Sequence, residues 1–247
     1  MIERNIGIIG DGGTDRAIFK KICECVLSDT NEQELMLNCI ELIRHKIVDP
    51  VNEYRRFFKD KATKDNATSK SICYLTSEPA LKLRRKVTAI LLSAFTEFEH
   101  ETEQISNRDI LLLTTDSESV LAKPDDYFEV TDWRVNIPKI LLGSIEEFYR
   151  VKAREGYNHE LLPLVIPVVT FPSTEIFVVA AKDMMKNYGK KPTELKQALY
   201  GTTNLQTLRE EDLKEKALNF ITPNSISKIF KDVPESRAFI QMLSFGR

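Results

Sequence analysis

The segment NIGIIGDGGTDRAIF, residues 5–19, carries the clearest secondary-structure signals of the chain. Its apolar run, 5–10, is short and closes in glycines, which predicts a buried strand followed by a tight turn. From Asp15 to Leu27 the apolar residues recur at helical spacing, and Thr14 or Asp15 is a suitable N-cap for that helix. Strand, turn and helix in this order open an α/β unit.

Two further apolar runs predict buried strands, at 109–115 and at 164–170. Pro167 lies within the second run and favours an edge position or a bulge, because proline lacks the N–H that a central strand donates. Residues 35–48 fit either a strand or a helix. Strands that alternate with helices are typical of a mostly parallel sheet with helices on both faces.

Helical spacing or helix-start signals are found in four more segments, namely 79–103, 138–154, 176–188 and a short stretch from Asp49 that precedes a polar loop at 59–70. Beyond Gly189, short helices alternate with prolines and glycines. We therefore expect an α/β domain over residues 1–188 and a helical C-terminal extension over 189–247 that packs on it.

The composition excludes several classes of protein. The chain has 247 residues, and its 35 Lys and Arg against 37 Asp and Glu give a net charge of −2, which argues against a strongly basic nucleic-acid module. It contains no apolar run long enough to span a membrane and no signal peptide. The four cysteines and three histidines lack zinc-ligand spacing. We expect a cytoplasmic protein.

Charge is unevenly distributed along the chain. Residues 1–181 carry a net charge of −6, and residues 182–247 carry +4. This fits an acidic metal site beside a segment that grips phosphate, and it equally fits ordinary surface variation. Lys20 on the first predicted helix and Lys182 after the third strand are the candidate phosphate-binding lysines, although solvated helix faces also carry such residues.

Acidic residues follow every predicted strand. Asp11 and Asp15 follow the first, Asp116 and Glu118 the second, and Glu175 the third. The carboxyl ends of parallel strands form the usual ligand-binding edge of such a sheet. Because alternate residues of an extended chain point the same way, Asp116 and Glu118 are expected to face one point. Paired carboxylates repel unless a cation lies between them, and Mg²⁺ or Mn²⁺ is the natural choice for oxygen ligands.

The first turn suits an anion or a metal. Gly12 and Gly13 remove side chains where a backbone approaches a phosphate, and the helix after Thr14 offers free N–H groups. The same residues also suit a plain strand-to-helix turn. Asp11 disfavours an anion at this place unless a metal shields it, so the acid favours a metal site.

Three segments together resemble the Toprim family, the metal-binding domain of topoisomerases, primases and overcoming-lysogenization-defect nucleases. They are IGIIGDGGTDRAIFKKI at 6–22, DILLLTTDSE at 109–118 and FPSTEIFVVAA at 171–181. The family pattern is a strand ending in E-G-x-T-D, a helix, and later a strand ending in D-x-D. The resemblance extends over about residues 5–188 and is strongest to small stand-alone Toprim-like proteins without an attached ATPase.

The resemblance assigns roles position by position. Asp11 takes the place of the leading glutamate, a metal ligand or general acid/base, and Asp15 matches the closing aspartate. Asp116 and Glu118 stand at the two acids of D-x-D, and Glu175 matches a later acidic segment. The implied catalytic residues are Asp11, Asp116 and Glu118, and the implied metal ligands are Asp11, Asp15, Asp116, Glu118 and Glu175. Gly12 and Thr14 match the turn of the motif. Together with the turn residue Gly13 and the two candidate lysines, the residues expected to bind substrate are Gly12, Gly13, Thr14, Lys20 and Lys182.

The implied activity is phosphodiester chemistry on nucleic acid with Mg²⁺ or Mn²⁺, as an endonuclease that acts on DNA rather than RNA. The resemblance also implies a prokaryotic defence or mobile-element system with a partner protein encoded nearby. Two departures, aspartate at 11 and glutamate at 118, shift carboxylates by one methylene each. They leave open a Toprim-like binding subunit that does not cleave. A separate alternative, based on the Gly12–Gly13 turn, is a nucleotide or phosphosugar enzyme.

Overall fold

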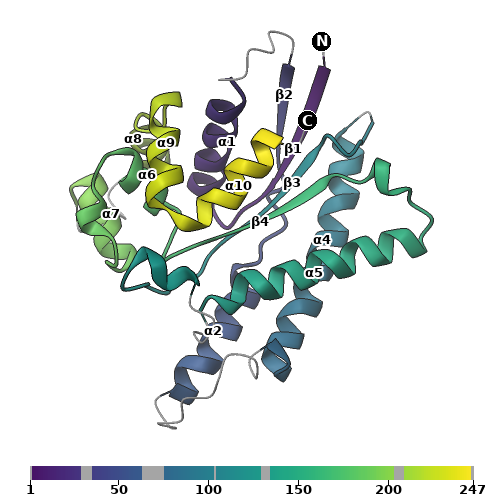
Figure 1. Cartoon of the computed structure of the whole chain (residues 1–247), viewed down its shortest axis with the longest axis horizontal. Helices are drawn as coiled ribbons and strands as arrows, with labels where there is room; N and C mark the ends of the chain where they lie inside the picture. Colours follow the sequence, from purple (N-terminus) through teal and green to yellow (C-terminus); the bar gives the residue numbers. More distant parts are fainter. Residues whose placement is uncertain are drawn as a thin grey trace.

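A single parallel sheet organises the molecule. The computed structural model describes residues 2–28, 35–62, 75–102, 104–128, 134–202 and 209–245. Within these ranges the strands are β1 (Ile2–Ile9), β2 (Leu35–Glu41), β3 (Ile110–Asp116) and β4 (Leu164–Thr170). Their order is β2-β1-β3-β4, and all neighbouring pairs are parallel (Figure 1). The expected α/β class is confirmed, and the segment that fitted either a strand or a helix contributes β2.

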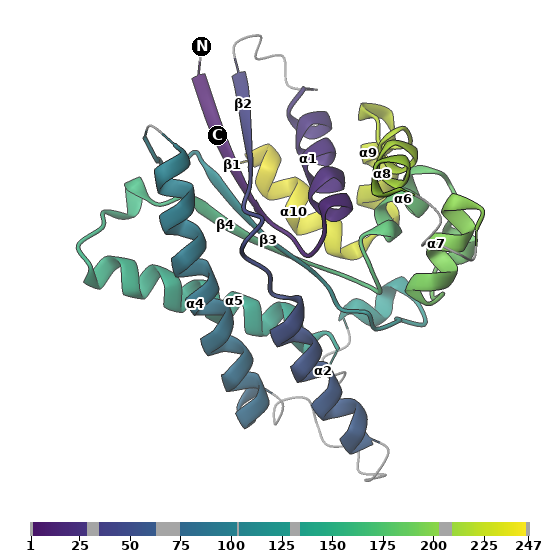
Figure 2. The same ribbon diagram turned by 180° about the vertical axis from the view of Figure 1, so that it is seen from behind.

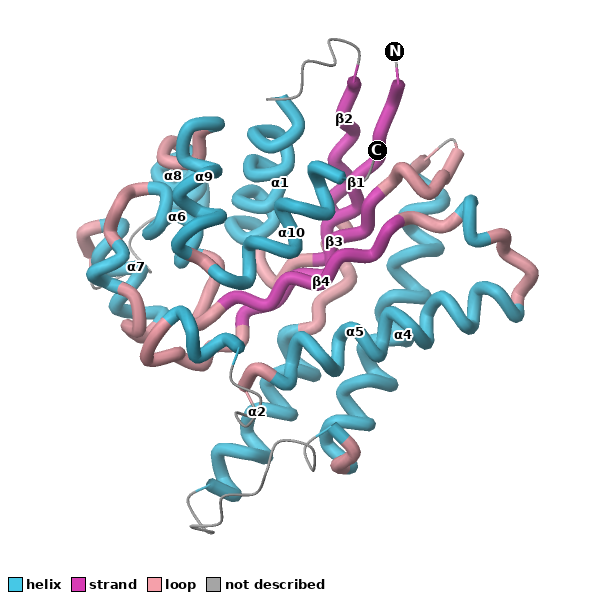
Figure 3. Tube along the Cα trace, in the orientation of Figure 1, coloured by secondary structure: helices cyan, strands magenta, loops and turns pink. Residues whose placement is uncertain are grey.

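Helices cover both faces of this sheet, and Figures 1 and 2 show the two groups on opposite sides of the strands. One group consists of α1 (Gly13–Ser28), α6 (Glu175–Ala181), α7 (Pro192–Tyr200), α8 (Glu210–Leu218), α9 (Pro223–Asp232) and α10 (Pro234–Phe245). The other consists of α2 (Val48–Ala62), α4 (Glu78–Glu101) and α5 (Asn136–Arg154). Short 3₁₀ turns lie at Pro124–Phe128, His159–Leu161 and Met185–Asn187. Figure 3 shows the resulting three layers.

Alternation along the strands divides the core in two. Ile8 of β1 is paired in register with Leu112 of β3, and both pack against the group of helices that contains α1. The next pair, Ile9 and Leu113, packs against α2, α4 and α5. Successive side chains of a strand point to opposite faces. A strand covered on both faces therefore reads as a continuous apolar run, which is why the sequence predicted these strands so clearly.

The path of the chain places a switch point between β1 and β3. From β1 the chain passes through α1 to β2 at one edge of the sheet, and then returns through α2 and α4 to β3 on the other side of β1. Ligands of open parallel sheets bind outside the carboxyl ends of the strands at such a point. Asp11 follows β1 and Asp116 ends β3, so both acids lie at this position.

The C-terminal helices belong to the core around α1. Phe239 of α10 meets Phe19 of α1 edge to face, with ring centroids 5.9 Å apart, and Leu195 of α7 is fully buried in the same cluster. The predicted extension therefore packs on one face of the sheet. The domain boundary at residue 188 stays a prediction.

Some predicted boundaries were wrong. Helix α1 begins at Gly13, and its first turn closes when the Arg16 N–H donates to the Gly12 carbonyl at 3.1 Å, so neither Thr14 nor Asp15 precedes the helix as an N-cap. The helix expected over 176–188 ends at Ala181. Asp183 takes a left-handed φ of 55°, which a short polar side chain tolerates but a helix cannot continue through.

Other boundaries agree with the sequence. Pro79 lies in the first turn of α4, where Ser77 caps the helix by accepting from the Ala80 N–H at 3.4 Å. Helix α2 is longer than expected and reaches Ala62, and residues 63–70 of the predicted loop lie outside the described ranges. Pro167 lies in β4, which is an edge strand as predicted. Among the described helices, none has the length and apolar character needed to cross a membrane.

Candidate functional site

The first two acids meet across the switch point. The Asp11 carboxylate accepts through one oxygen, Oδ2, from the Thr115 hydroxyl at 2.8 Å and from the Asp116 backbone N–H at 3.1 Å. Both donors lie at the end of β3, whereas Asp11 follows β1. These two hydrogen bonds join the carboxyl ends of the central strands and place the first acid directly against the second.

Asp116 in turn joins β3 to the segment after β4. Its Oδ1 accepts from the Thr170 hydroxyl at 2.6 Å, from the Thr174 N–H at 2.9 Å and from the Thr174 hydroxyl at 2.8 Å. Both threonines are buried. Three donors on one oxygen hold this side chain in one orientation and draw the start of α6 toward the switch point.

Glu175 brings the third strand end to the cluster. It is the first residue of α6, only 4% exposed, and its Oε1 lies 3.4 Å from the Lys196 Nζ of α7. The sequence analysis missed Lys196, which lies 21 residues after Glu175. No motif marks this lysine, and the packing of α7 against α6 alone places it here.

The acids of this cluster are crowded. Burial raises the pKa of Asp11 to about 6, and repulsion from Asp15 adds to this effect, although the Asp116 amide opposes it. Burial followed by repulsion from Glu175 raises the pKa of Asp15. Burial, then Asp15 and Glu175, hold the pKa of Asp116 well above its usual range.

One ammonium, that of Lys196, interacts with three of these carboxylates. Burial lowers the pKa of Lys196, but attraction from Glu175, Asp116 and Asp15 outweighs burial, so its pKa is raised overall. Lys196 therefore interacts with three of the four acids, and Asp11 joins the cluster through its hydrogen bond from the Asp116 N–H. Such an arrangement holds protons more tightly than exposed acids do, or it takes up a second cation.

The hydrogen bonding of the cluster is incomplete. Within the described residues, two buried oxygens, Asp11 Oδ1 and Glu175 Oε2, accept no hydrogen bond. Buried polar atoms without partners cost free energy, so each marks a place where a ligand can be accommodated. The described side chains nevertheless contain no group of three or more His, Cys, Asp or Glu already arranged as metal ligands. A cation would have to draw these carboxylates closer together.

Glu118 lies apart from these hydrogen bonds. Strand β3 ends at Asp116, and Glu118 has a left-handed φ of 45°, so the alternation expected of an extended chain does not reach it. Its carboxylate pairs with Arg55 of α2 at 3.1 Å, and its carbonyl accepts from the same guanidinium at 3.1 Å. The structure thus joins Asp11, Asp15, Asp116 and Glu175, but directs Glu118 toward α2.

The glycine turn makes room for the Asp15 carboxylate rather than for an anionic ligand. A Cβ on Gly12 would lie 3.1 Å from Asp15 Oδ2, so the absence of a side chain lets that carboxylate approach the turn. Gly13 and Thr14 form the first residues of α1. A phosphate at this turn would meet the negative charge of Asp15.

The two predicted lysines have other neighbours. Lys182 follows α6, and its Nζ lies 4.3 Å from the centroid of the Phe220 ring. Lys20 on α1 acts electrostatically on Cys39 of β2, where it opposes the effect of burial on the thiol pKa. Neither lysine is among the groups that act on the acids of the cluster.

The sequence analysis also missed Arg16, which shapes the end of β1. Its guanidinium is buried, pairs with Glu41 at 3.0 Å and donates to the Gly10 carbonyl at 3.2 Å. A Cβ on Gly10 would lie 2.7 Å from the Arg16 Cγ, so glycine is required for this close approach. The arginine thereby fixes the backbone immediately before Asp11.

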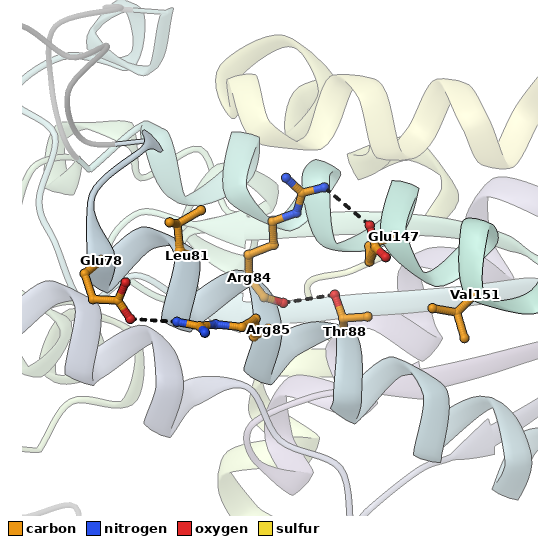
Figure 4. Close-up of a pocket in the computed structure, with 7 residues that line it drawn as sticks. All are labelled: Glu78, Leu81, Arg84, Arg85, Thr88, Glu147 and Val151. Atoms are coloured by element: carbon orange, nitrogen blue, oxygen red, sulfur yellow. Dashed lines mark hydrogen bonds and ion pairs between the residues drawn. The ribbon is translucent and has the colours of Figure 1, made fainter.

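A separate groove lies between α4 and α5 (Figure 4). It encloses about 550 Å³ and shares no lining residue with the carboxylate cluster. Arg85 pairs with Glu78 at 2.6 Å and Arg84 with Glu147 at 3.9 Å, so its charges are balanced. This groove offers no excess charge for a phosphate or a metal.

Comparisons of the chain with protein-family models, curated proteins and solved structures gave no match. The resemblance to the Toprim family therefore rests on the three sequence segments, and the function must be argued from the carboxylate cluster itself.

Proposed function

We propose that this chain binds Mg²⁺ or Mn²⁺ between Asp11, Asp15, Asp116 and Glu175 and performs phosphodiester chemistry on nucleic acid as an endonuclease, with DNA as its substrate. One observation carries the proposal: carboxylates from the ends of β1, β3 and β4 converge on a single ammonium. The Toprim-like motifs, the defence or mobile-element context and a neighbouring partner protein remain predictions from the resemblance.

The donor set supports a hard divalent ion. All four side chains offer oxygen, and two of their buried oxygens make no hydrogen bond within the described residues. A divalent ion would offset the burial and the mutual repulsion that raise the pKa values of Asp11, Asp15 and Asp116. Since no three ligands are already arranged, binding requires side-chain movement, and Asp15 and Glu175 lie on helices that begin at the site.

The residues of the chain would then take separate roles. When bound, the ion would polarise the scissile phosphate and supply a hydroxide-like nucleophile. In the metal-free protein Asp11, whose pKa burial raises to about 6, holds a proton below about pH 6 and would release it when the ion binds. A cation on Glu175 would weaken its ion pair with Lys196 and leave that ammonium available to a phosphate oxygen.

Plasmid nicking with Mg²⁺ and Mn²⁺ tests this proposal, together with calorimetric titration of Mn²⁺. We expect Asp116→Asn to abolish nicking and to weaken Mn²⁺ binding at least tenfold. Glu118→Gln is the second variant to test. The D-x-D pattern predicts that Glu118 is a metal ligand, whereas in the structure Glu118 pairs with Arg55. If Glu118 is not a metal ligand, the Mn²⁺ affinity of this variant stays within about twofold of that of wild type. Wild-type protein that binds no Mn²⁺ would refute the proposal.

A non-cleaving binding subunit is the second candidate. The lack of a ready-made ligand group and the orientation of Glu118 favour it. Mn²⁺ binding without nicking, together with a stable complex with a co-expressed neighbour, would identify this case. ATP or sugar-phosphate binding that survives Asp116→Ala would instead indicate the phosphosugar alternative.

A further inference from the structure

The positive charge of the chain is concentrated in one segment of the sequence. Residues 48–86 contain ten Lys and Arg against five Asp and Glu, a net charge of +5, whereas the rest of the chain carries −7. This segment supplies α2 and the first part of α4. The segment lies within residues 1–181, whose net charge of −6 conceals this local excess of positive charge.

Two exposed lysines of this segment pair with one carboxylate. The Lys82 Nζ lies 2.5 Å from Glu53 Oε1, and the Lys86 Nζ lies 2.6 Å from Glu53 Oε2. Arg56 is exposed one helical turn after Glu53 on α2. We call Arg56, Lys82 and Lys86 the basic face. Its three positive charges exceed the single negative one, and both lysines are about half exposed.

The basic face is connected to the acids through α2. Helix α2 packs against α4 and against β3, the strand that ends at Asp116. Further along the same helix, Arg55 contacts both the carboxylate and the carbonyl of Glu118, two residues after Asp116. Figures 1 and 2 show α2 and the first turns of α4 projecting past the carboxyl edge of the sheet, away from both chain termini.

An acidic site needs attraction from elsewhere on the surface to hold a polyanion. Four carboxylates repel a phosphate backbone until a cation shields them, whereas exposed Lys and Arg release counterions when they contact phosphates. The exposed ion pairs with Glu53 are weak and readily exchanged for phosphate.

We infer that the basic face formed by Arg56, Lys82 and Lys86 binds the phosphate backbone of duplex DNA whose scissile bond lies at the carboxylate cluster. This inference rests on the proposed function and assigns the surface that provides its affinity. Glu53 competes with the DNA for the two lysines. The contact is to phosphates, so it depends on salt and not on base sequence.

Fluorescence anisotropy of a labelled 20-base-pair duplex tests the inference, with the full chain in EDTA at 50–200 mM salt. The triple variant Arg56→Gln/Lys82→Gln/Lys86→Gln is expected to bind at least about tenfold more weakly at 100 mM salt. Its slope of log affinity against log salt should fall by about two to three units. Lys82→Arg/Lys86→Arg should retain wild-type affinity, because it keeps both charges.

A gain of affinity provides a second test that loss of folding cannot imitate. Glu53→Gln removes the competing carboxylate, so this variant should bind the duplex several-fold more tightly than wild type. The matched control is Lys214→Gln/Lys216→Gln/Lys231→Gln, which removes three charges from α8 and α9 on the other side of the sheet. This control should stay within about twofold of wild type.

The outcomes separate the two claims. If wild-type protein binds the duplex and the basic-face variant matches it in affinity and salt slope, the inference is overturned while the proposed function stands. If the control variant loses as much affinity as the basic-face variant, the binding is diffuse and the inference again fails. If wild-type protein fails to bind the duplex at 50 mM salt both in EDTA and with Mn²⁺ present, the proposed function is itself contradicted.

Discussion

Replacing Glu235 by glutamine measures the cost of one buried charge. Glu235 lies in the first turn of α10, is 4% exposed and accepts from the Phe171 N–H at 3.2 Å through Oε1. Its Oε2 makes no hydrogen bond within the described residues. Burial raises the pKa of Glu235 from 4.5 to about 7, against which Arg237 acts only weakly, and the neighbouring Tyr127 and Tyr188 supply no positive charge.

The expected change in unfolding free energy follows from the linkage between proton binding at Glu235 and folding. A pKa raised by about 2.5 units corresponds to about 3 kcal/mol of unfolding free energy. The native state binds this proton more tightly than the unfolded state does. The stabilisation is therefore complete below about pH 4.5 and is lost as the pH rises through about 7. Glutamine keeps an acceptor for Phe171 and stays neutral at every pH, so it should stabilise the protein by up to about 3 kcal/mol at pH 8.5.

Urea unfolding in EDTA at pH 4.5 and pH 8.5 provides the assay. We expect Glu235→Gln and wild type to have similar unfolding free energies at pH 4.5 and to diverge at pH 8.5, with the variant more stable. Glu146→Gln, on an exposed position of α5, is the control and should show no such divergence. A variant less stable than wild type at pH 8.5, or a difference that does not depend on pH, would refute the reasoning.

Three further predictions concern the cluster and the core. Mn²⁺ should raise the thermal midpoint of wild type more at pH 8 than at pH 5.5, because protons compete for Asp11, whose pKa burial raises to about 6. Calorimetry should show that EDTA reverses this rise in thermal midpoint and that Mn²⁺ does not raise the midpoint of Asp11→Asn. A rise of equal size at both pH values would count against a carboxylate site. Lys196→Met should lower the urea midpoint of the metal-free protein, since Glu175 loses its ion pair. Added Mn²⁺ should reduce the difference in urea midpoint between this variant and wild type. If Mn²⁺ left this difference in urea midpoint unchanged, the ion would not reach Glu175. Gly7→Ala should destabilise the fold by about 1–3 kcal/mol in urea unfolding, because the new Cβ would lie 2.8 Å from Leu111 Cδ1 and from Phe98 Cδ2. Unchanged stability would show that these side chains can move aside.

The apolar runs and turn residues carried most of the information about the fold. The strands at 5–10, 109–115 and 164–170 were predicted because each is buried on both faces and therefore continuously apolar. The segment at 35–48 was ambiguous because β2 is an edge strand with exposed positions, which breaks the apolar run. Helix ends were less certain, since Asp183 ends α6 by a backbone conformation that no residue type dictates.

The sequence likewise predicted the positions of some residues of the candidate site and not of others. The order of acids at successive strand ends was sufficient to predict that Asp11, Asp15, Asp116 and Glu175 act on one another, because parallel strands end at one edge. Spacing alone misplaced Glu118, because alternation holds only while the chain stays extended. Its left-handed φ turns it toward Arg55.

By itself the sequence determined the parallel α/β architecture and the edge of the sheet where acidic side chains gather, since both follow from local patterns of apolar and acidic residues. Only the tertiary structure decided which cations meet those acids. Lys196 reaches Glu175 through the packing of α7 on α6, and Lys82 and Lys86 meet at Glu53 through the packing of α2 on α4. Contacts between residues distant in the chain depend on how whole helices pack, and that information is not contained in the spacing of any single segment.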